Sequence, residues 1–528
     1  MPTLEIDGQS LTIADVGRVA RSAPGHVSLR LSTDAQSRVQ RARELVERFV
    51  QEGRIVYGVT TGFGALKDQL IGPEHILDLQ RNLIMSHAAG VGEPLPEEAV
   101  RAMILVRANA LAAGYSGLRL ATLETLLELL NRGVHPIVPA QGSVGASGDL
   151  APLAHIALVL IGQGEAVYRG ERLPGSEALR RAGLAPIVPA AKEGLALTNG
   201  TAMQTALGAL LVHDAARLCQ VADIAGALSL EALQGVPEAF DPRLHAVRPH
   251  PGQQEVAAHV RRLIAGSTLV CNETTTLRAR ALKGEASSKV QDPYCLRCLP
   301  QVHGAVRDAV AHARRVVEIE LNAATDNPLI FGDGASEAVA LSGGNFHGQP
   351  IAMALDFLGL AGTVLGNISE RRIDRLLNSG GLLPRFLVGE GGFHSGLMLV
   401  QYTAAALASE NKVLAHPASA DSIPTSAGFE DFVSMGPHAA RKGREILRNV
   451  TSILAGELLV AAQGVDLRRR AAPEARLGSG SAVAYRLVRE RVPFLEGDAV
   501  LAPLLAAVQT LVADDGFVAA VEAAAGGV

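Results

Sequence analysis

The chain has 528 residues, of which 48% are hydrophobic and only 3% aromatic, and it contains no tryptophan. A chain of this length can bury a large core, and its Ala- and Leu-rich composition favours helical packing over a β-sandwich. The formal net charge of −5 argues against a basic surface that binds nucleic acid.

The cysteines and the N-terminus indicate the compartment. The four cysteines, Cys219, Cys271, Cys295 and Cys298, are typical of free thiols in an intracellular protein. Cys295 and Cys298 form a Cys-x-x-Cys pair, but no second pair or His-x-His cluster completes a metal site, so no metal is predicted. The N-terminus is acidic where a secretory signal is basic, and unbroken apolar runs fall far short of the ~20 residues that span a bilayer. The sequence therefore predicts a cytoplasmic protein that does not enter a membrane.

The N-terminal part of the chain is predicted to be mixed in structure. Residues 4–6 and 27–31 alternate between apolar and polar side chains and predict short strands. Residues 53–64 are rich in glycine and predict a loop. Apolar residues at helical spacing predict helices over 35–52, 73–89, 97–111 and 120–131.

From Gly200 onward the pattern changes to long apolar helices. These are predicted over residues 201–235, 349–377, 396–414 and 436–463. Stretches of this length with few breaks indicate a helical bundle. The segment 351–365 has Asp356 as its only charge, so it must be buried on more than one side, as in a central helix or an oligomer interface. We therefore predict a mainly α protein, with residues 1–200 as an N-terminal region and residues 201–528 as a long-helix bundle with C-terminal helices.

One loop has an unusual composition. Residues 142–155 read Gly-Ser-Val-Gly-Ala-Ser-Gly-Asp-Leu-Ala-Pro-Leu-Ala-His. At its centre, the amide nitrogen of Gly148 can attack the carbonyl carbon of Ala146. Loss of two waters, one from the Ser147 hydroxyl, would leave an exocyclic methylene on a five-membered ring. Glycine at 148 permits the close approach and the backbone angles that this needs, and Asp149 is predicted to cap the helix that follows.

An Ala-Ser-Gly tripeptide alone is most often a turn, but the whole stretch 142–155 resembles the prosthetic-group loop of the histidine and aromatic amino acid ammonia-lyases. That family forms 4-methylideneimidazol-5-one (MIO) from Ala-Ser-Gly, without an external cofactor. Further blocks that resemble the family lie between residues 50 and 435. The resemblance implies a fumarase/aspartase-like helical bundle and a homotetramer whose active sites are each built from three subunits.

Two blocks of the N-terminal region carry candidate residues. Tyr57 begins the stretch Tyr-Gly-Val-Thr-Thr-Gly-Phe-Gly, where on its own it would be an ordinary loop anchor. The resemblance implies a catalytic acid/base, which requires a pKa below the usual value of about 10. His87 follows Ser86 and would on its own be structural. The resemblance implies contact with the substrate side chain, and a Ser-His pair is similar to the histidine-specific branch of the family.

Two residues are expected next to the prosthetic group. Asn199, in Ala-Leu-Thr-Asn-Gly-Thr, can cap the helix that follows it. The resemblance implies that Asn199 also holds the oxygen of the prosthetic group and stabilises the ring when it becomes anionic. Phe346, in Ser-Gly-Gly-Asn-Phe-His-Gly, is similar to the aromatic residue that packs near that group.

The block Lys289-Val290-Gln291-Asp292-Pro293-Tyr294-Cys295-Leu296-Arg297 provides the predicted substrate grip. Arg297 is the candidate for the substrate carboxylate, because its planar fork matches carboxylate geometry. The alternative for Arg297 is a salt bridge between subunits. The resemblance implies that Tyr294 moves protons and that Gln291 orients the site.

The last block, residues 424–435, matches the family pattern at Glu430 but departs from it at neighbouring positions. Glu430 matches the acid of the histidine-specific branch, where it meets the substrate imidazole or acts as a base. Relatives of that branch usually read Asn-Gln-Glu-Asp-His, whereas this chain has Gly428, Phe429 and Phe432 at three of those positions. The loss of an amide and an imidazole makes this part of the pocket more apolar.

The resemblance implies non-oxidative deamination of L-histidine to trans-urocanate and ammonia by a carbon–nitrogen lyase. The alternatives within the family are a phenylalanine or tyrosine ammonia-lyase, or an aminomutase that returns the ammonia to the β-carbon. From another class of protein, residues 142–148 could be a glycine loop that binds an anion at a helix start. This alternative is disfavoured because the loop lacks the Gly-Lys-Ser/Thr signature. A non-catalytic helical scaffold is disfavoured by the joint presence of Tyr57, Ser147 and Arg297.

Overall fold

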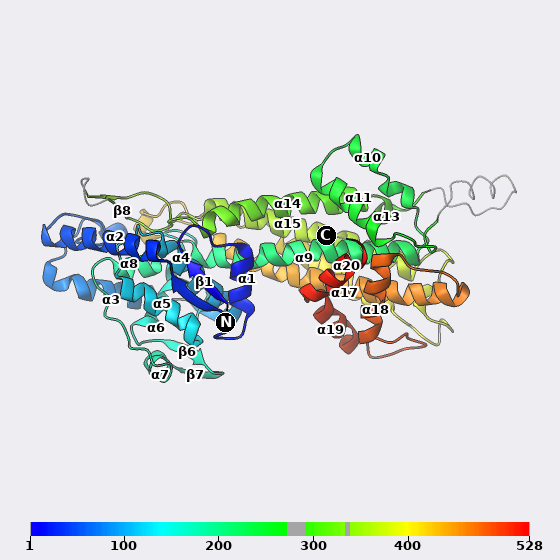
Figure 1. Ribbon diagram of the computed structural model, residues 1–528, viewed down its shortest axis with the longest axis horizontal. Helices are drawn as coiled ribbons and strands as arrows, with labels where there is room; N and C mark the ends of the chain where they lie inside the picture. Colours follow the sequence, from blue (N-terminus) through cyan, green and yellow to red (C-terminus); the bar gives the residue numbers. More distant parts are fainter. Residues whose placement is uncertain (1, 272–290, 333–337, 527–528) are drawn as a thin grey trace. The chain divides into compact units, whose positions relative to one another are not determined.

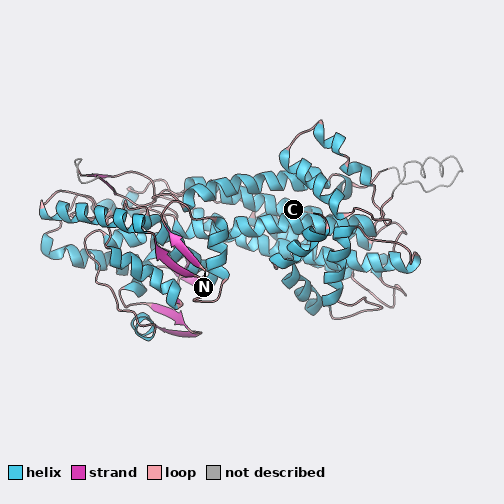
Figure 2. Ribbon diagram, in the orientation of Figure 1, coloured by secondary structure: helices cyan, strands magenta, loops and turns pink. Residues whose placement is uncertain are grey.

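The computed structural model describes residues 2–271, 291–332 and 338–526 (Figure 1). In these residues helices predominate and the strands are short (Figure 2), which confirms the predicted mainly α class. Lys289 and Val290, from the block that carries Arg297, lie outside the described residues.

The helices confirm the predicted long elements to within a few residues at most ends. In chain order they are α1 (Ile13–Arg21), α2 (Thr33–Gln51), α3 (Ile76–His87), α4 (Glu97–Ala112), α5 (Leu120–Arg132), α6 (Leu150–Leu160), α7 (Gly175–Arg181), α8 (Glu193–Thr198), α9 (Ala202–Ala232), α10 (Pro242–Ala246), α11 (Pro251–Leu263), α13 (Tyr294–Arg297), α14 (Leu299–Leu321), α15 (Gln349–Leu377), α16 (Met398–Leu414), α17 (Gly436–Ala471), α18 (Ser479–Arg491), α19 (Leu501–Val512) and α20 (Asp515–Ala524). Short 3-10 turns lie at η1 (Gly64–Leu66), η2 (Pro73–His75), η3 (Pro237–Phe240), η4 (Arg385–Leu387) and η5 (Ser426–Gly428).

The strands form small, separate sheets. They are β1 (Thr3–Ile6), β2 (Ser28–Leu31), β3 (Val91–Pro94), β4 (Val134–Pro136), β5 (Pro139–Gln141), β6 (Glu165–Tyr168), β7 (Glu171–Pro174), β8 (Leu329–Phe331) and β9 (Val339–Leu341). The predicted N-terminal strands are confirmed as the parallel pair β1 and β2, with Leu4 opposite Leu29. The other pairings, β3 with β5, β4 with β6 and β7, and β8 with β9, are antiparallel.

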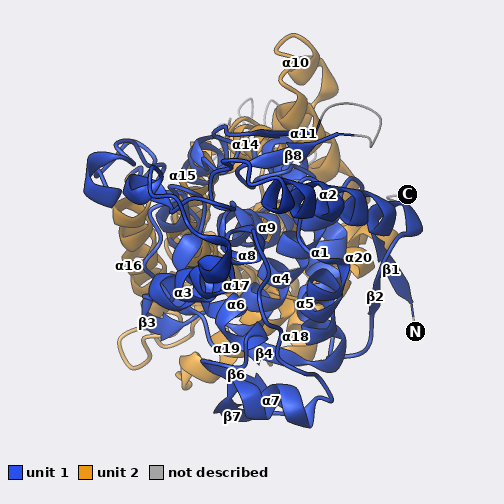
Figure 3. Cartoon of the chain, turned by 90° about the vertical axis from the view of Figure 1, so that its left-hand side faces the viewer, with its two compact units in different colours: residues 1–213, 313–356, 417–441 blue, residues 214–312, 357–416, 442–528 orange. Residues whose placement is uncertain are grey.

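The chain forms two compact units (Figure 3). Unit 1 contains residues 1–213, 313–356 and 417–441, and unit 2 contains residues 214–312, 357–416 and 442–528. The helices α9, α14, α15 and α17 each contribute residues to both units. The boundary predicted between residues 200 and 201 stays a prediction.

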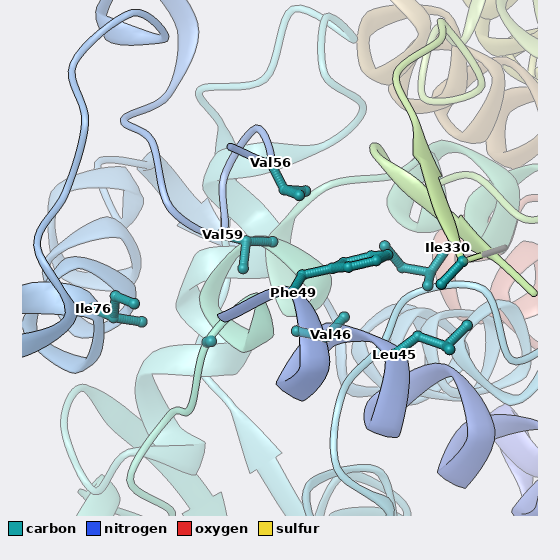
Figure 4. Close-up of a cluster of buried hydrophobic side chains, with 9 residues drawn as sticks. Leu45, Val46, Phe49, Val56, Val59, Ile76 and Ile330 are labelled. Atoms are coloured by element: carbon teal, nitrogen blue, oxygen red, sulfur yellow. The ribbon is translucent and has the colours of Figure 1, made fainter. Parts of the chain in front are cut away.

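A buried apolar cluster in unit 1 anchors the loop that carries Tyr57. Phe49, on the inner face of α2, is fully buried in this cluster, together with Val56 and Val59 on either side of Tyr57 (Figure 4). Ile76 of α3 and other apolar residues complete the cluster. Burial of each such side chain contributes roughly 1.5–3 kcal/mol. The cluster therefore fixes both ends of the short segment in which Tyr57 lies.

Both helix caps predicted near the Ala-Ser-Gly loop are wrong. Asp149 precedes α6, but its side chain makes no hydrogen bond to the start of that helix. Instead its Oδ2 accepts from the backbone N–H of Gln204, 3.0 Å away in the first turn of α9. Asn199 ends α8 and does not cap α9. The free N–H groups at a helix start donate to any nearby oxygen, and for α9 this oxygen comes from Asp149, a residue distant in sequence.

Two of the helices in the described residues have membrane-like composition. By length and hydropathy, α15 and α17 are long and apolar enough to cross a bilayer, as is the bent pair α19 and α20 if it is counted as one span. The sequence analysis looked only for unbroken apolar runs. It therefore did not identify these helices as long and apolar enough to span a bilayer. The rest of the structure buries 61% of the apolar window of α15 and 78% of that of α17.

Candidate active site

A cavity of about 1150 Å³ in unit 1 brings together most of the predicted site residues. Its lining includes Tyr57, His87, Ala146, Ser147, Asn199, Phe346 and Glu430. These residues come from six separate stretches of the chain. Gln291, Tyr294 and Arg297 belong to unit 2.

The backbone of the Ala-Ser-Gly segment is held in a tight turn. Ser147 has φ of +52° and Gly148 has φ of +72°, and this left-handed conformation is costly for a serine. A Cβ on Gly148 would lie 2.1 Å from the carbonyl oxygen of Gly200. Only glycine therefore fits at position 148, in agreement with the sequence prediction.

Gly200 clamps this turn through the backbone alone. Its N–H donates to the Ser147 carbonyl oxygen at 3.2 Å, and its own carbonyl accepts from the Asp149 N–H at 2.7 Å. Gly200 was absent from the predicted site. The available signal was its place directly after Asn199, where a side chain would also meet Arg107 and Thr325.

Glu430 lies beside the serine of the turn. The Ser147 hydroxyl donates to Glu430 Oε1 at 3.4 Å, and the Thr425 hydroxyl donates to Oε2 at 3.0 Å. Glu430 is half-buried in the cavity wall. A carboxylate in this position can accept a proton or a hydrogen bond from a molecule that lies against residue 147.

Catalysis by a free tyrosinate requires surroundings that lower the pKa of the tyrosine, but the surroundings of Tyr57 raise it. Burial raises the pKa of Tyr57 above its usual value of 10.0, and the nearby charge of Glu430 raises it further. The N–H of Gly64 donates to the Tyr57 hydroxyl at 3.1 Å, which acts in the other direction. In unit 1 taken alone, Tyr57 therefore keeps its proton at neutral pH.

His87 is the last residue of α3 and faces the same cavity. Its Nδ1 lies 3.0 Å from the Ser86 hydroxyl. Burial lowers the pKa of His87, although Glu430 acts in the opposite direction. The imidazole is therefore neutral at pH 7 and can both donate and accept a hydrogen bond.

Asn199 is buried, and its amide nitrogen is already engaged. Nδ2 donates to Asp326 Oδ1 and to the carbonyl oxygen of Asn327, both at 3.2 Å. The Asn199 Oδ1 atom has no hydrogen-bond partner among the described residues. The sequence suggested the side chain of Asn199 as the donor at this position. In the structure, the donor that reaches the Ser147 carbonyl oxygen is the Gly200 N–H.

Aromatic residues close to Glu430 in the sequence line the same cavity. Phe429 and Phe432, the two departures from the family pattern, line the cavity with half or more of their surface exposed. The Lys67 ammonium lies 5.2 Å from the centre of the Phe429 ring. Phe432 stacks on His347 with a ring separation of 6.0 Å. The cavity lining therefore combines several aromatic rings with the carboxylates of Asp68, Glu430 and Asp431.

In unit 2, the predicted substrate grip forms a compact turn. Arg297 Nε donates to the Asp292 carbonyl oxygen at 2.8 Å, and its guanidinium lies 4.7 Å from the centre of the Tyr294 ring. Neither terminal nitrogen of Arg297 has a hydrogen-bond partner in the described part of the chain. Tyr294 is 70% exposed, and Gln291 is exposed as well. Among the described residues, no cluster of His, Cys, Asp and Glu has the arrangement of a metal site.

Comparison with known proteins covers nearly the whole chain. The family model described as aromatic amino acid lyase matches residues 11–490. Histidine ammonia-lyase from Chloroflexus aurantiacus is 55% identical, over 98% of this chain and 97% of the relative. The histidine ammonia-lyase from Caldanaerobacter subterraneus is 54% identical over 94% of each chain.

Solved structures agree. Histidine ammonia-lyase from Trypanosoma cruzi has a TM-score of 0.89 and 42% identity, covering 99% of this chain and 95% of that one. Tyrosine aminomutase from Streptomyces globisporus has a TM-score of 0.92 and 40% identity, covering 99% of each. These matches confirm both the predicted fold class and the resemblance drawn from the sequence blocks. The chain belongs to the aromatic amino acid lyase family.

Proposed function

We propose that this protein deaminates L-histidine non-oxidatively to trans-urocanate and ammonia. The observation that carries the proposal is the strained Ser147–Gly148 turn, clamped by Gly200 and placed 3.4 Å from the Glu430 carboxylate. The histidine ammonia-lyases that are 50–55% identical to this chain support histidine as the substrate.

The prosthetic group of the proposal is MIO, and the residues present fit it. Position 148 has no room for a side chain, and Ala146 and Ser147 line the cavity. The Gly200 N–H already donates to the Ser147 carbonyl oxygen, where it would stabilise negative charge. Once formed from Ala146-Ser147-Gly148, MIO supplies an electrophilic carbon for the amine of the substrate.

The electrostatics of Glu430 and Tyr57 favour a substrate with an imidazole. Glu430 raises the pKa of Tyr57, so a free Glu430 carboxylate opposes proton removal by Tyr57. An imidazole N–H that donates to Glu430 spreads its charge and weakens this effect. His87, being neutral, can hold the other edge of the imidazole. Tyr57 takes the β-proton as a tyrosinate, after its own proton has passed to solvent, with Glu430 or Tyr294 as the alternative base.

Binding of the substrate carboxylate is assigned to Arg297. Its Nε is engaged by the Asp292 carbonyl oxygen, which leaves its two terminal nitrogens to form a bidentate pair with a carboxylate. Gln291 orients the site from the same segment, and Phe346 packs against the prosthetic group. Asn199 lines the same cavity, and its contact with the prosthetic group remains part of the proposal.

We propose a cytoplasmic homotetramer whose active sites are shared between subunits, without nucleic acid or membrane partners. Along α15, Met353, Phe357, Leu360 and Val364 recur at helical spacing and are each more than a third exposed. Such an apolar stripe on a long helix suits burial against another subunit. Sedimentation of a fully active monomer would contradict this assembly.

The test is a competition assay with equal L-histidine, L-phenylalanine and L-tyrosine, in which all products are separated by chromatography. Urocanate as the main product would support the proposal. Cinnamate, coumarate or β-amino acids as main products would favour the second candidate, a phenylalanine or tyrosine lyase or an aminomutase. The observation in favour of this candidate is the pair of exposed rings of Phe429 and Phe432 in the cavity.

A further inference from the structure

A fully buried ion pair occurs in unit 2. Arg372 of α15 and Glu457 of α17 have no exposed surface. Arg372 Nε donates to Glu457 Oε1 at 2.6 Å, and Nη2 donates to Oε2 at 2.9 Å. The hydroxyls of Ser229 and Ser369 donate to the same carboxylate at 2.7 and 2.6 Å. Four donors fix the orientation of Glu457, and the bidentate pair in turn fixes the plane of the guanidinium.

The remaining nitrogen of Arg372 contacts the substrate-grip turn. Nη1 donates to the carbonyl oxygen of Cys295 at 3.5 Å and lies 3.3 Å from His303 Nε2. Cys295 sits in α13, directly after Tyr294 and two residues before Arg297. Arg372 is therefore a side chain of the unit 2 core that reaches the middle of this short helix.

The neighbouring helix makes room for this contact. A Cβ on Gly226 of α9 would lie 2.4 Å from Leu299 Cδ1 and 3.7 Å from the guanidinium carbon of Arg372. Leu299 begins α14, immediately after the α13 turn. A side chain at 226 would therefore displace the Leu299 side chain and contact the Arg372 guanidinium.

We propose that Arg372 is a positioning residue that holds the α13 turn, through the Cys295 carbonyl, where Arg297 takes up the substrate carboxylate. A buried ion pair is costly to desolvate, and apolar residues of similar volume often stabilise a core as well or better. The third contact, to the Cys295 carbonyl, gives this pair a role other than stability. The inference rests on the proposed function for the role of Arg297, whereas the contact itself does not.

The test uses the full-length protein with Arg372→Lys. Lysine keeps a positive charge for Glu457 but lacks the Nη1 nitrogen that reaches the Cys295 carbonyl. The matched control is Arg371→Lys at the next, exposed position, where the arginine pairs with Glu370. We expect the KM for the amino acid to rise about tenfold, the effect of one charge-assisted hydrogen bond. The kcat should stay within about twofold, because carboxylate binding is uniform between ground and transition state.

A second readout does not depend on activity. Cys295 is half-buried in the turn, so its alkylation rate should rise about tenfold in Arg372→Lys as the turn loses its anchor. Cys219, which is 2% exposed in the core of unit 2, should stay protected. If wild type proved inactive on every amino acid, the proposed function would fail while the Cys295 measurement still decided the contact.

Several outcomes would overturn the inference. These are an unchanged KM, an unchanged Cys295 rate, or exposure of Cys219 together with Cys295, which would indicate general loosening of unit 2. If Arg372→Lys does not fold, the double variant Arg372→Met/Glu457→Met removes the pair without leaving an unpaired charge. The same two readouts then apply to it, with the same expected results.

Discussion

Replacement of Asp149 by asparagine should change how the stability of the protein depends on pH. Asp149 has no exposed surface. Its carboxylate accepts from the N–H of Gln204, the Gln204 amide and the Ser143 hydroxyl, and no cation is among its hydrogen-bond partners in the described residues. Burial raises the pKa of Asp149 from 3.8 to about 7, although these hydrogen bonds act against the rise.

The sign and size of the effect follow from this pKa. The folded protein keeps the Asp149 proton up to a pH of about 7, whereas the unfolded chain loses it near 3.8. Between these values the folded state binds more protons, so the free energy of unfolding falls as pH rises through the window and stays low above it. A difference of ~3 pH units corresponds to roughly 4 kcal/mol per chain. Asp149→Asn has no such titration.

The measurement is urea unfolding of wild type and Asp149→Asn at fixed protein concentration, from pH 4 to pH 8. The free energy of unfolding of the variant relative to wild type should increase across this range by up to about 4 kcal/mol. Asp34→Asn, at an exposed position in the first turn of α2, serves as the control and should follow wild type. A difference between Asp149→Asn and wild type that is the same at both ends of the range would refute the reasoning.

Three further predictions concern the site and the core. Ser147→Ala removes the hydroxyl that cyclisation eliminates, so activity should be lost. Intact-mass analysis should show wild type lighter than its sequence by two waters and the variant at full mass, and wild type at full mass would contradict the MIO proposal. Glu430→Gln should reduce histidine turnover far more than phenylalanine turnover, and equal losses would mean that Glu430 does not contact the imidazole. Burial raises the pKa of Cys219 to about 12, which lowers its thiolate fraction at pH 8 about a thousandfold. Iodoacetamide should therefore spare Cys219 in the native protein while it modifies the partly exposed Cys295, as peptide mass mapping would reveal.

The sequence predicted those parts of the molecule that are local in the chain. Long helices such as α15 follow from apolar spacing. The Gly148 constraint follows from the chemistry of a tripeptide, and the choice of Tyr57 and Glu430 follows from short blocks that resemble the family. Each of these signals is contained in a few consecutive residues, so it can be recognised before the fold is known.

Contacts between distant segments could not be predicted in this way. Asp149 caps α9 where its own helix was expected, and the amide nitrogen of Asn199 is bound by Asp326 and Asn327. The pKa of Tyr57 is raised by burial in the folded unit 1 and further by Glu430, which lies far away in the chain. In each case the spacing of residues shows which groups are available but does not show which partner the fold brings to them.

The backbone contacts of Gly200 make the shape of the Ser147 turn depend on folding of the chain. The turn at Ser147 is shaped by a residue that is made much later during synthesis and that must first be placed between α8 and α9. On the proposed function, a chain that has never folded therefore contains only an ordinary serine at this position. On the proposed function, acquisition of the reactive group is a maturation step that only a correctly folded unit 1 can complete. The missing two waters in the mass of a molecule would then serve as a permanent record that it once folded.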